Sequence, residues 1–191
     1  MTPESRKPSE TGDTYGSPVQ VRHERYGAGL ALDLNLFGAE LGTFLHRCFE
    51  VLGSRPDLAP RIPELTGVEA SATAVSAIAA SVERFESWLG QISTQEALRE
   101  WPLLMLDGSG SVVSGTADLI ACSPSGIWVI DHKSDNIDDP AEAFQKYRSQ
   151  LDLYAAALAA QDMHVLGVGI NWIRLGVVTL HDLATADRRK C

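Results

Sequence analysis

Large apolar residues recur at helical spacing in the first half of the chain. One repeat of three or four residues predicts an amphipathic helix from about Gly38 to Leu52, with an apolar face made of Leu41, Phe44, Leu45, Phe49 and Leu52. A second helix is predicted at about 68–89, where an Ala-rich segment carries its own apolar stripe. Three prolines lie between the two segments and predict a break in the chain there.

The second half of the chain alternates in the manner of strands, with turn residues between them. After the strands, an Asp-Asp-Pro sequence is typical of a helix start with proline at its first position. The predicted elements are strands at 100–106, 111–121 and 127–133, turns at 107–110 and 123–126, a helix at 141–160, and strands at 165–173 and 177–181. This α-βββ-α-β order predicts an α/β fold with a mixed sheet, because the long helix lets the following strand return parallel to an earlier one.

The N-terminal segment has a different composition from the rest of the chain. Residues 1–25 are rich in Pro, Ser, Thr, Glu and Gly and hold few large apolar side chains, so they bury too little surface to offset their ordering entropy. We expect a flexible segment at 1–25 and a single domain at 26–191.

Charge and cysteine content narrow the possible functions. The net charge of -9 argues against a protein that binds nucleic acid through a broad basic surface, but it leaves open a nuclease whose local field is set by a bound cation. The three cysteines are scattered, which fits reduced thiols and excludes a four-cysteine iron-sulfur cluster. No apolar run approaches the roughly 20 residues of a membrane helix, so we expect a soluble, cytoplasmic protein.

The candidate chemistry lies on one predicted hairpin, from Gly115 to Lys133. Strand alternation places Asp131 and Lys133 on one face with Val129, and the hairpin brings Asp118 near them. Two converging carboxylates suit Mg²⁺ or Mn²⁺, and a neighbouring ammonium group can stabilise charge on a phosphate. Taken singly, Asp118 is equally consistent with a turn cap or an exposed strand position, and Lys133 with a surface lysine.

Four ordered segments together are more specific. Gly42–Glu50, Gly115–Asp118, Asp131–Lys133 and Tyr147–Tyr154 resemble the motifs of RecB-type nuclease domains of the PD-(D/E)xK superfamily. From about Gly38 onward, the chain is most similar to the nuclease domain at the C-terminus of bacterial AddA-type helicase-nucleases. The resemblance implies a restriction-endonuclease-like core.

The resemblance also implies roles for individual residues. His46, Asp118 and Asp131 would bind the metal ion, and Lys133 would be the catalytic lysine. Considered alone, His46 would more often be an ordinary histidine on a helix face. Mn²⁺ becomes an acceptable alternative to Mg²⁺ because an imidazole ligand suits first-row transition ions.

Residues outside the metal site receive roles by the same resemblance. Gln150 and Tyr154 would lie beside the site and help to hold the DNA strand or order the lysine, on a helix face that also carries Tyr147. Tyr147 is equally consistent with packing on the sheet. Glu100 falls where the family often has a glutamate, which implies a supporting position behind the metal ligands.

The expected function is that of a Mg²⁺- or Mn²⁺-dependent deoxyribonuclease, either exonuclease or endonuclease. The resemblance implies single-stranded DNA as substrate and a helicase partner or attached helicase domain in DNA repair or recombination. The 191 residues contain no GxxxxGK[ST] loop, so ATP hydrolysis would belong to another polypeptide or segment. Two alternatives remain: a non-catalytic nuclease-fold module that guides DNA in a repair complex, and a hydrolase acting on another phosphate ester.

Overall fold

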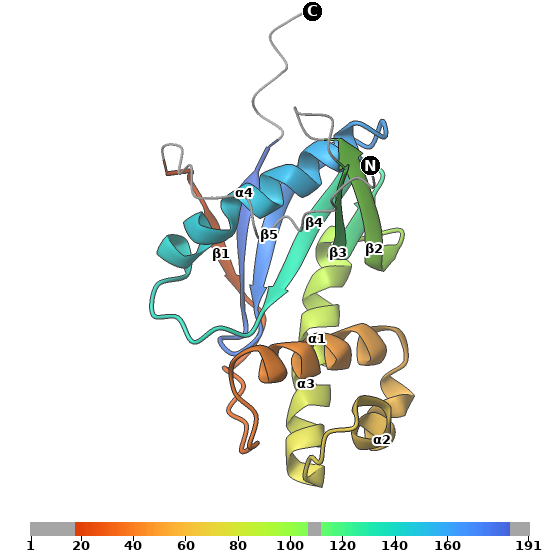
Figure 1. The fold of residues 1–191 in the computed structure, drawn as a ribbon, viewed down its shortest axis with the longest axis vertical. Coiled ribbons are helices and arrows are strands. Elements are labelled where there is room, and N and C mark those ends of the chain that lie inside the picture. Colours follow the sequence, from red (N-terminus) through yellow and green to blue (C-terminus); the bar gives the residue numbers. More distant parts are fainter. Residues whose placement is uncertain (1–17, 107–111, 184–191) are drawn as a thin grey trace, which may run out of the picture.

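The computed structural model describes residues 18–106 and 112–183, and its centre is a six-stranded sheet (Figure 1). The strand order is β1-β6-β5-β4-β3-β2, in which β4 and β5 are parallel and the other neighbours antiparallel. The strands are β1 (Arg22–Arg25), β2 (Ala97–Leu106), β3 (Val112–Ser123), β4 (Gly126–Lys133), β5 (Val165–Trp172) and β6 (Val177–Asp182). The predicted mixed α/β architecture is confirmed and is consistent with a restriction-endonuclease-like fold.

Helices cover both faces of this sheet. They are α1 (Gly38–Ser54), the 3-10 helix η2 (Pro56–Arg61), α2 (Ile62–Thr66), α3 (Ala72–Ile92) and α4 (Pro140–Ala159). The proline-containing segment therefore forms short helical turns rather than a plain break. Pro56 and Pro63 lie in first turns, where proline is tolerated, and Pro60 lies inside the 3-10 helix. No helix in the described part of the chain is long and apolar enough to cross a membrane.

One region differs from the sequence-based expectation. Residues 22–25, which the composition assigned to the flexible segment, form the edge strand β1 and pair with β6. Glu24 in this strand accepts a hydrogen bond of 2.7 Å from the indole of Trp88 on α3. Backbone pairing and this bond compensate for the small apolar surface of the segment. The turn predicted at 107–110 lies outside the described residues.

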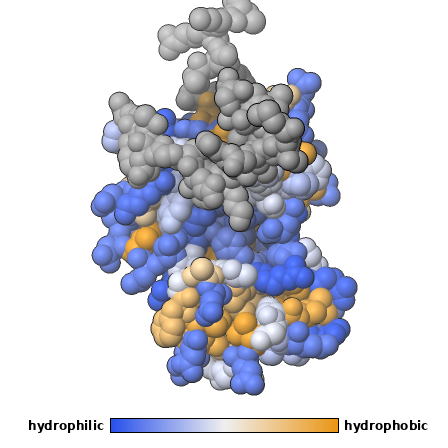
Figure 2. All heavy atoms as spheres, viewed as in Figure 1, coloured by the Kyte–Doolittle hydropathy of each residue, from blue (hydrophilic) through white to orange (hydrophobic). Residues whose placement is uncertain are grey.

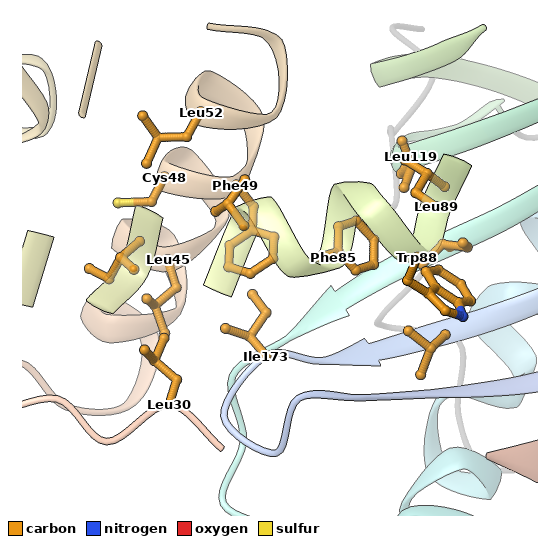
Figure 3. Close-up of a cluster of buried hydrophobic side chains, with 14 of the residues drawn as sticks. Leu30, Leu45, Cys48, Phe49, Leu52, Phe85, Trp88, Leu89, Leu119 and Ile173 are labelled. Carbon is orange, nitrogen blue, oxygen red and sulfur yellow. The ribbon is translucent and has the colours of Figure 1, made fainter. Parts of the chain in front are cut away.

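The sheet separates two hydrophobic clusters. On one face, α1 and α3 pack against the sheet through residues that include Phe49, Phe85 and Leu119 (Figure 3). On the other face, α4 packs through Phe144, Leu151 and neighbouring side chains. Figure 2 shows that exposed hydrophobic residues gather over the lower part of the view, which holds α1 and α2.

Helix α4 begins as the sequence predicts. Asp139 caps it by accepting hydrogen bonds from the backbone N–H groups of Ala141 and Glu142, at 2.8 and 3.2 Å, and Pro140 occupies the first turn. The helix then crosses the sheet and returns the chain to β5, parallel to β4. This crossover leaves the C-terminal end of β4, with Asp131 and Lys133, beside the α4 face.

Glycine in β5 makes room for a large side chain of β4. A Cβ at Gly167 would overlap the ring of Trp128 and lie 2.5 Å from the carbonyl oxygen of His181. Gly90 in α3 is the opposite case, because nothing lies within 4 Å of an added Cβ.

We expect Gly167→Ala to lower the free energy of unfolding by about 1–3 kcal/mol through overpacking. Gly90→Ala should raise the free energy of unfolding by about 0.5–1 kcal/mol, because alanine loses less backbone entropy in a helix. Urea unfolding of both variants beside the wild type measures the difference. Equal effects of the two substitutions would contradict the packing described for Trp128.

Candidate active site

The site forms where strands β3 and β4 separate. Their antiparallel ladder ends at the pair Leu119–Ile130, so the register brings Asp118 and Asp131 opposite each other at the first position beyond it. At this position the Asp118 side chain provides a hydrogen-bond acceptor in place of a β3 backbone carbonyl group. Its Oδ2 accepts a 2.7 Å hydrogen bond from the backbone N–H of His132. Beyond this point β3 stays paired with β2, and β4 stays paired with β5.

A third carboxylate belongs to the same row. The β2–β3 register places Glu100 opposite Asp118, between the pairs Arg99–Leu119 and Trp101–Ala117. Glu100 has φ of +50°, a region that non-glycine residues rarely occupy. The predicted supporting position of Glu100 therefore coincides with a local irregularity of β2. The strand register thus places three acidic residues, Glu100, Asp118 and Asp131, in one row across adjacent strands at this end of the sheet.

Asp131 is held by two neighbouring side chains. Its Oδ2 lies 2.5 Å from Nζ of Lys133, and its Oδ1 accepts a long hydrogen bond of 3.4 Å from Nε2 of Gln150 on α4. The Lys133 ammonium also lies 4.8 Å from the ring centre of Tyr147. The predicted alternation holds: Asp131 faces α4, whereas His132 faces α1 and α3.

Tyr154 lies beneath Gln150 rather than at the surface. Its hydroxyl accepts a 2.8 Å hydrogen bond from Gln150 Nε2, and the residue is only 4% exposed. Burial raises the pKa of Tyr154 to about 12, so its hydroxyl stays protonated. Tyr154 is thereby linked through Gln150 to Asp131.

His46 reaches the site from α1. Its Nδ1 lies 3.5 Å from Oδ2 of Asp118, and its ring contacts the ring of His132 edge-on at 5.9 Å between centroids. Burial lowers the pKa of His46, which favours the neutral imidazole. A neutral imidazole is the form that binds metal ions.

Burial and nearby negative charges raise the pKa values of Asp118 and Glu100. Burial raises the pKa of Asp118 well above its usual range, and the negative charge of Asp131 raises it further. The pKa of Glu100 is raised for the same two kinds of reason, with burial first and then the charges of Glu50 and Asp131. Carboxylates crowded in this way favour a bound cation, because a cation restores their ionised form.

A groove of about 590 Å³ opens above these groups. Helix α1 supplies one wall, and Glu100, Lys133 and the residues that follow Lys133 supply the rest. Asp131 lies deeper and is 3% exposed. Glu50, one turn after His46, also lines the groove, but it is paired with Arg47 at 2.6 Å.

The side chains of His46, Asp118 and Asp131 carry the kinds of donor atom that a divalent metal ion binds, although these atoms do not converge on one point. Across residues 18–106 and 112–183, no three His, Cys, Asp or Glu side chains converge as a ready metal site. The Asp131 carboxylate is instead paired with the Lys133 ammonium group. Two carboxylates and a neutral imidazole are nevertheless a donor set that Mg²⁺ or Mn²⁺ accepts.

One polar partner near the site was not identified from the sequence. Asn171 on β5 donates a 3.0 Å hydrogen bond from Nδ2 to Nδ1 of His132, which fixes the proton of this neutral histidine on Nε2. Both residues are buried, and burial lowers the pKa of His132 well below its usual value. The signal was a polar residue inside the apolar run of β5, since a buried amide requires a partner.

Known proteins with similar sequences are nucleases or helicase/nuclease subunits. The profile of the PD-(D/E)XK nuclease superfamily matches residues 22–186. A curated relative, an ATP-dependent helicase/nuclease subunit of Streptococcus sanguinis (strain SK36), is 31% identical over 134 residues, which are 64% of this chain and 11% of that protein. The chain thus spans about one tenth of the length of this relative.

A solved structure, the crystal structure of SSO0001, is 18% identical. The superposition covers 73% of this chain and 66% of the other, with a TM-score of 0.37, which is too low to add to the fold assignment.

The His132–Asn171 bond predicts a non-additive effect on stability. Asn171→Val and His132→Phe should each cost about 1–3 kcal/mol, because each leaves a buried polar group without its partner. The double variant should cost less than the sum by about 0.5–3 kcal/mol. Urea unfolding of the wild type, the two single variants and the double variant completes this double-mutant cycle. Asn136→Val serves as a surface control. Additive costs would show that the two side chains are not coupled.

Proposed function

The chain belongs to the PD-(D/E)XK nuclease superfamily, and from this premise we propose that it is a metal-dependent deoxyribonuclease acting on single-stranded DNA. Members of this superfamily generally use divalent metal ions. The observation that carries the proposal is the row of Glu100, Asp118 and Asp131 across three adjacent strands, with His46 and Lys133 beside it.

In this proposal Asp118, Asp131 and His46 hold the metal ion. When bound, Mg²⁺ or Mn²⁺ supplies a Lewis acid for the phosphate and lowers the pKa of a water molecule. Lys133 leaves Asp131 and donates hydrogen bonds to a non-bridging oxygen of the scissile phosphate, where negative charge accumulates.

Two further groups keep the carboxylates in place during the reaction. The backbone N–H of His132 fixes Asp118, and Gln150 fixes the Oδ1 atom of Asp131. Tyr154 in turn orients Gln150. In the hydrolysis, the oxygen of a water molecule bonds to phosphorus as the phosphorus–oxygen bond on the opposite side breaks. The attacking water releases a proton to solvent and the leaving oxygen takes one from solvent, so the products are a phosphate end and a hydroxyl end.

Support for the partner and the substrate comes from the relative and from charge. The curated relative is a helicase/nuclease subunit, which supports delivery of the strand by a helicase in DNA repair or recombination. The net charge of -9 also supports delivery of DNA by a partner. Binding of DNA by this chain alone would depend on Lys and Arg side chains, and its 16 Lys and Arg residues are outnumbered by 25 Asp and Glu residues.

Catalysis should depend on Asp131 and Lys133 and not on similar residues elsewhere. We expect Asp131→Asn and Lys133→Ala to lower cleavage of end-labelled single-stranded DNA by about 10²-fold or more, as removal of one charge-stabilising group does in other enzymes. Asp162→Asn, in the turn that follows α4, and Lys146→Ala, exposed on α4, are matched controls that should cleave like the wild type.

The same assay separates the alternatives. Cleavage of circular single-stranded DNA identifies an endonuclease, and cleavage of linear DNA alone identifies an exonuclease. A wild-type chain that binds DNA but never cuts it with Mg²⁺ or Mn²⁺ would contradict the proposal and favour a non-catalytic module. Preference for RNA or for small phosphodiesters would favour a different hydrolase.

Metal binding should be visible without any substrate. Mn²⁺ at about 100 times its dissociation constant should stabilise the folded protein by about 2.7 kcal/mol, because it binds the native site and not the unfolded chain. Asp118→Asn should lose most of this stabilisation, whereas Asp162→Asn should keep it. Thermal unfolding with Mn²⁺ and with EDTA measures both effects. Equal stabilisation of all three proteins would place the metal elsewhere.

A further inference from the structure

The loop that follows β4 contacts two helices beside the candidate active site. Residues 134–139 connect β4 to α4. The hydroxyl of Tyr147 on α4 donates a 3.1 Å hydrogen bond to Oδ2 of Asp135, and Asp135 lines the active-site groove. On the α1 side, Oγ of Ser134 would lie 3.2 Å from a Cβ added at Gly42. The segment that follows β4 is therefore held between α1 and α4.

Tyr147 also contacts the ammonium group of Lys133 through the face of its ring. The Nζ atom lies over the ring at 4.8 Å from its centre, which is within the range of a cation–π interaction. Tyr147 comes from α4, which crosses this face of the sheet (Figure 1). One side chain thus contacts both Lys133 and the loop that begins at the next residue.

The ring of Tyr147 is fixed by a second aromatic contact. Its centre lies 6.0 Å from that of Trp172, which is fully buried and donates a 2.8 Å hydrogen bond from its indole N–H to Thr179 on β6. Trp172 is also the register partner of Lys133 in the parallel pair of β4 and β5. A fixed indole beside the ring and a hydrogen bond at the hydroxyl together set the orientation of the ring at Lys133.

Packing against Trp172 does not by itself account for a tyrosine at this position. An aliphatic side chain would supply the apolar contact without the hydrogen bond to Asp135 or the ring face at Lys133. Burial, followed by the charge of Asp135, raises the pKa of Tyr147 to about 12, so the hydroxyl stays protonated and can donate. Both polar contacts of Tyr147 are made with Lys133 or with the loop directly after it.

Metal binding would remove the carboxylate partner of Lys133. The structure pairs the ammonium group with Asp131, which becomes a metal ligand in the proposed function. The side chain of Lys133 is only 18% exposed, so water replaces little of the lost interaction. A largely buried ammonium group needs another favourable contact. The face of an aromatic ring supplies one, and it does not compete for the metal ion because it offers no ligand atom.

We propose that Tyr147 is a positioning residue for Lys133, and that its ring holds the ammonium group beside the scissile phosphate once a metal ion has taken Asp131. The inference rests on the proposed nuclease function and adds a residue to it. Tyr147 acts through Lys133 and not through contact with DNA, so its loss should affect the rate of cleavage rather than binding of the strand.

The first measurement observes Lys133 by NMR and needs no cleavage. The sequence holds four lysines, so a chain labelled with ¹³C in lysine gives Cε–Hε signals from four residues, and Lys133→Ala identifies those of Lys133. The ring current of Tyr147 should shift the Lys133 signals upfield of the others, both in EDTA and at saturating Mg²⁺. Tyr147→Leu should abolish this shift, whereas Tyr147→Phe should keep it. Tyr26→Leu, which removes a tyrosine on the opposite face of the sheet, is the matched control and should also keep it.

The second measurement is the steady-state cleavage of end-labelled single-stranded DNA with Mg²⁺. Tyr147→Leu should lower kcat about tenfold and leave KM unchanged, as expected for loss of one cation–π interaction with a largely buried ammonium group. Tyr147→Phe should retain most of the wild-type kcat, because it retains the ring. Tyr147→Met, which also lacks a ring, takes the place of Tyr147→Leu in both measurements if the leucine variant does not fold.

Each other outcome has a definite meaning. The inference is overturned by Lys133 signals that are unshifted in the wild type, that lose their shift with Mg²⁺, or that are the same in Tyr147→Leu. An equal fall of kcat in Tyr147→Phe and Tyr147→Leu also overturns it, because the ring would then not be the cause. A protein that cuts DNA while its Lys133 signals are indifferent to Tyr147 keeps the proposed function and loses the inference. A protein with the Tyr147-dependent shift that never cuts DNA keeps Tyr147 as the residue that positions Lys133 and loses the proposed function.

Discussion

The separation of β3 from β4 is the constraint on which the site depends. Where two strands part, each loses backbone hydrogen bonds, and buried N–H groups need another acceptor. The Asp118 carboxylate supplies it for His132, at 2.7 Å. The same separation brings Asp118 and Asp131 opposite each other, with Glu100 on the far side. Crowded buried carboxylates repel one another unless a cation compensates them, and here Lys133 does so for Asp131.

Strand β4 joins the two sides of the domain because it is buried on both faces. Its alternation sends Asp131 and Lys133 toward α4, and sends His132 toward α1 and α3. Each buried polar group then meets a partner from a different element: Gln150 from α4, and Asn171 from β5. Both hydrophobic clusters therefore affect the geometry of the site. Packing of α4 positions Gln150 against Asp131, and packing of α1 and α3 positions the ring of His132.

Local patterns in the sequence predict much of this arrangement. Apolar spacing predicted α1, the meander of β2, β3 and β4, and α4, because each pattern extends over several turns or residues. Alternation predicted that Asp131 and Lys133 share one face of the strand. The partner Asn171 and the pairing of β1 with β6 were not predicted, because both depend on strands distant in sequence. The 4% exposure of Tyr154 could not be read from the sequence either, since helical periodicity places residues on a face but does not fix their depth.

Whether the acidic row and His46 surround a common cation is the central claim, and anomalous scattering from a crystal grown with Mn²⁺ tests it most directly. The account predicts an anomalous peak bonded to His46, Asp118 and Asp131, with the Lys133 ammonium moved away from Asp131. A peak with other ligands, or no peak while Lys133 stays bound to Asp131 at saturating Mn²⁺, would contradict it.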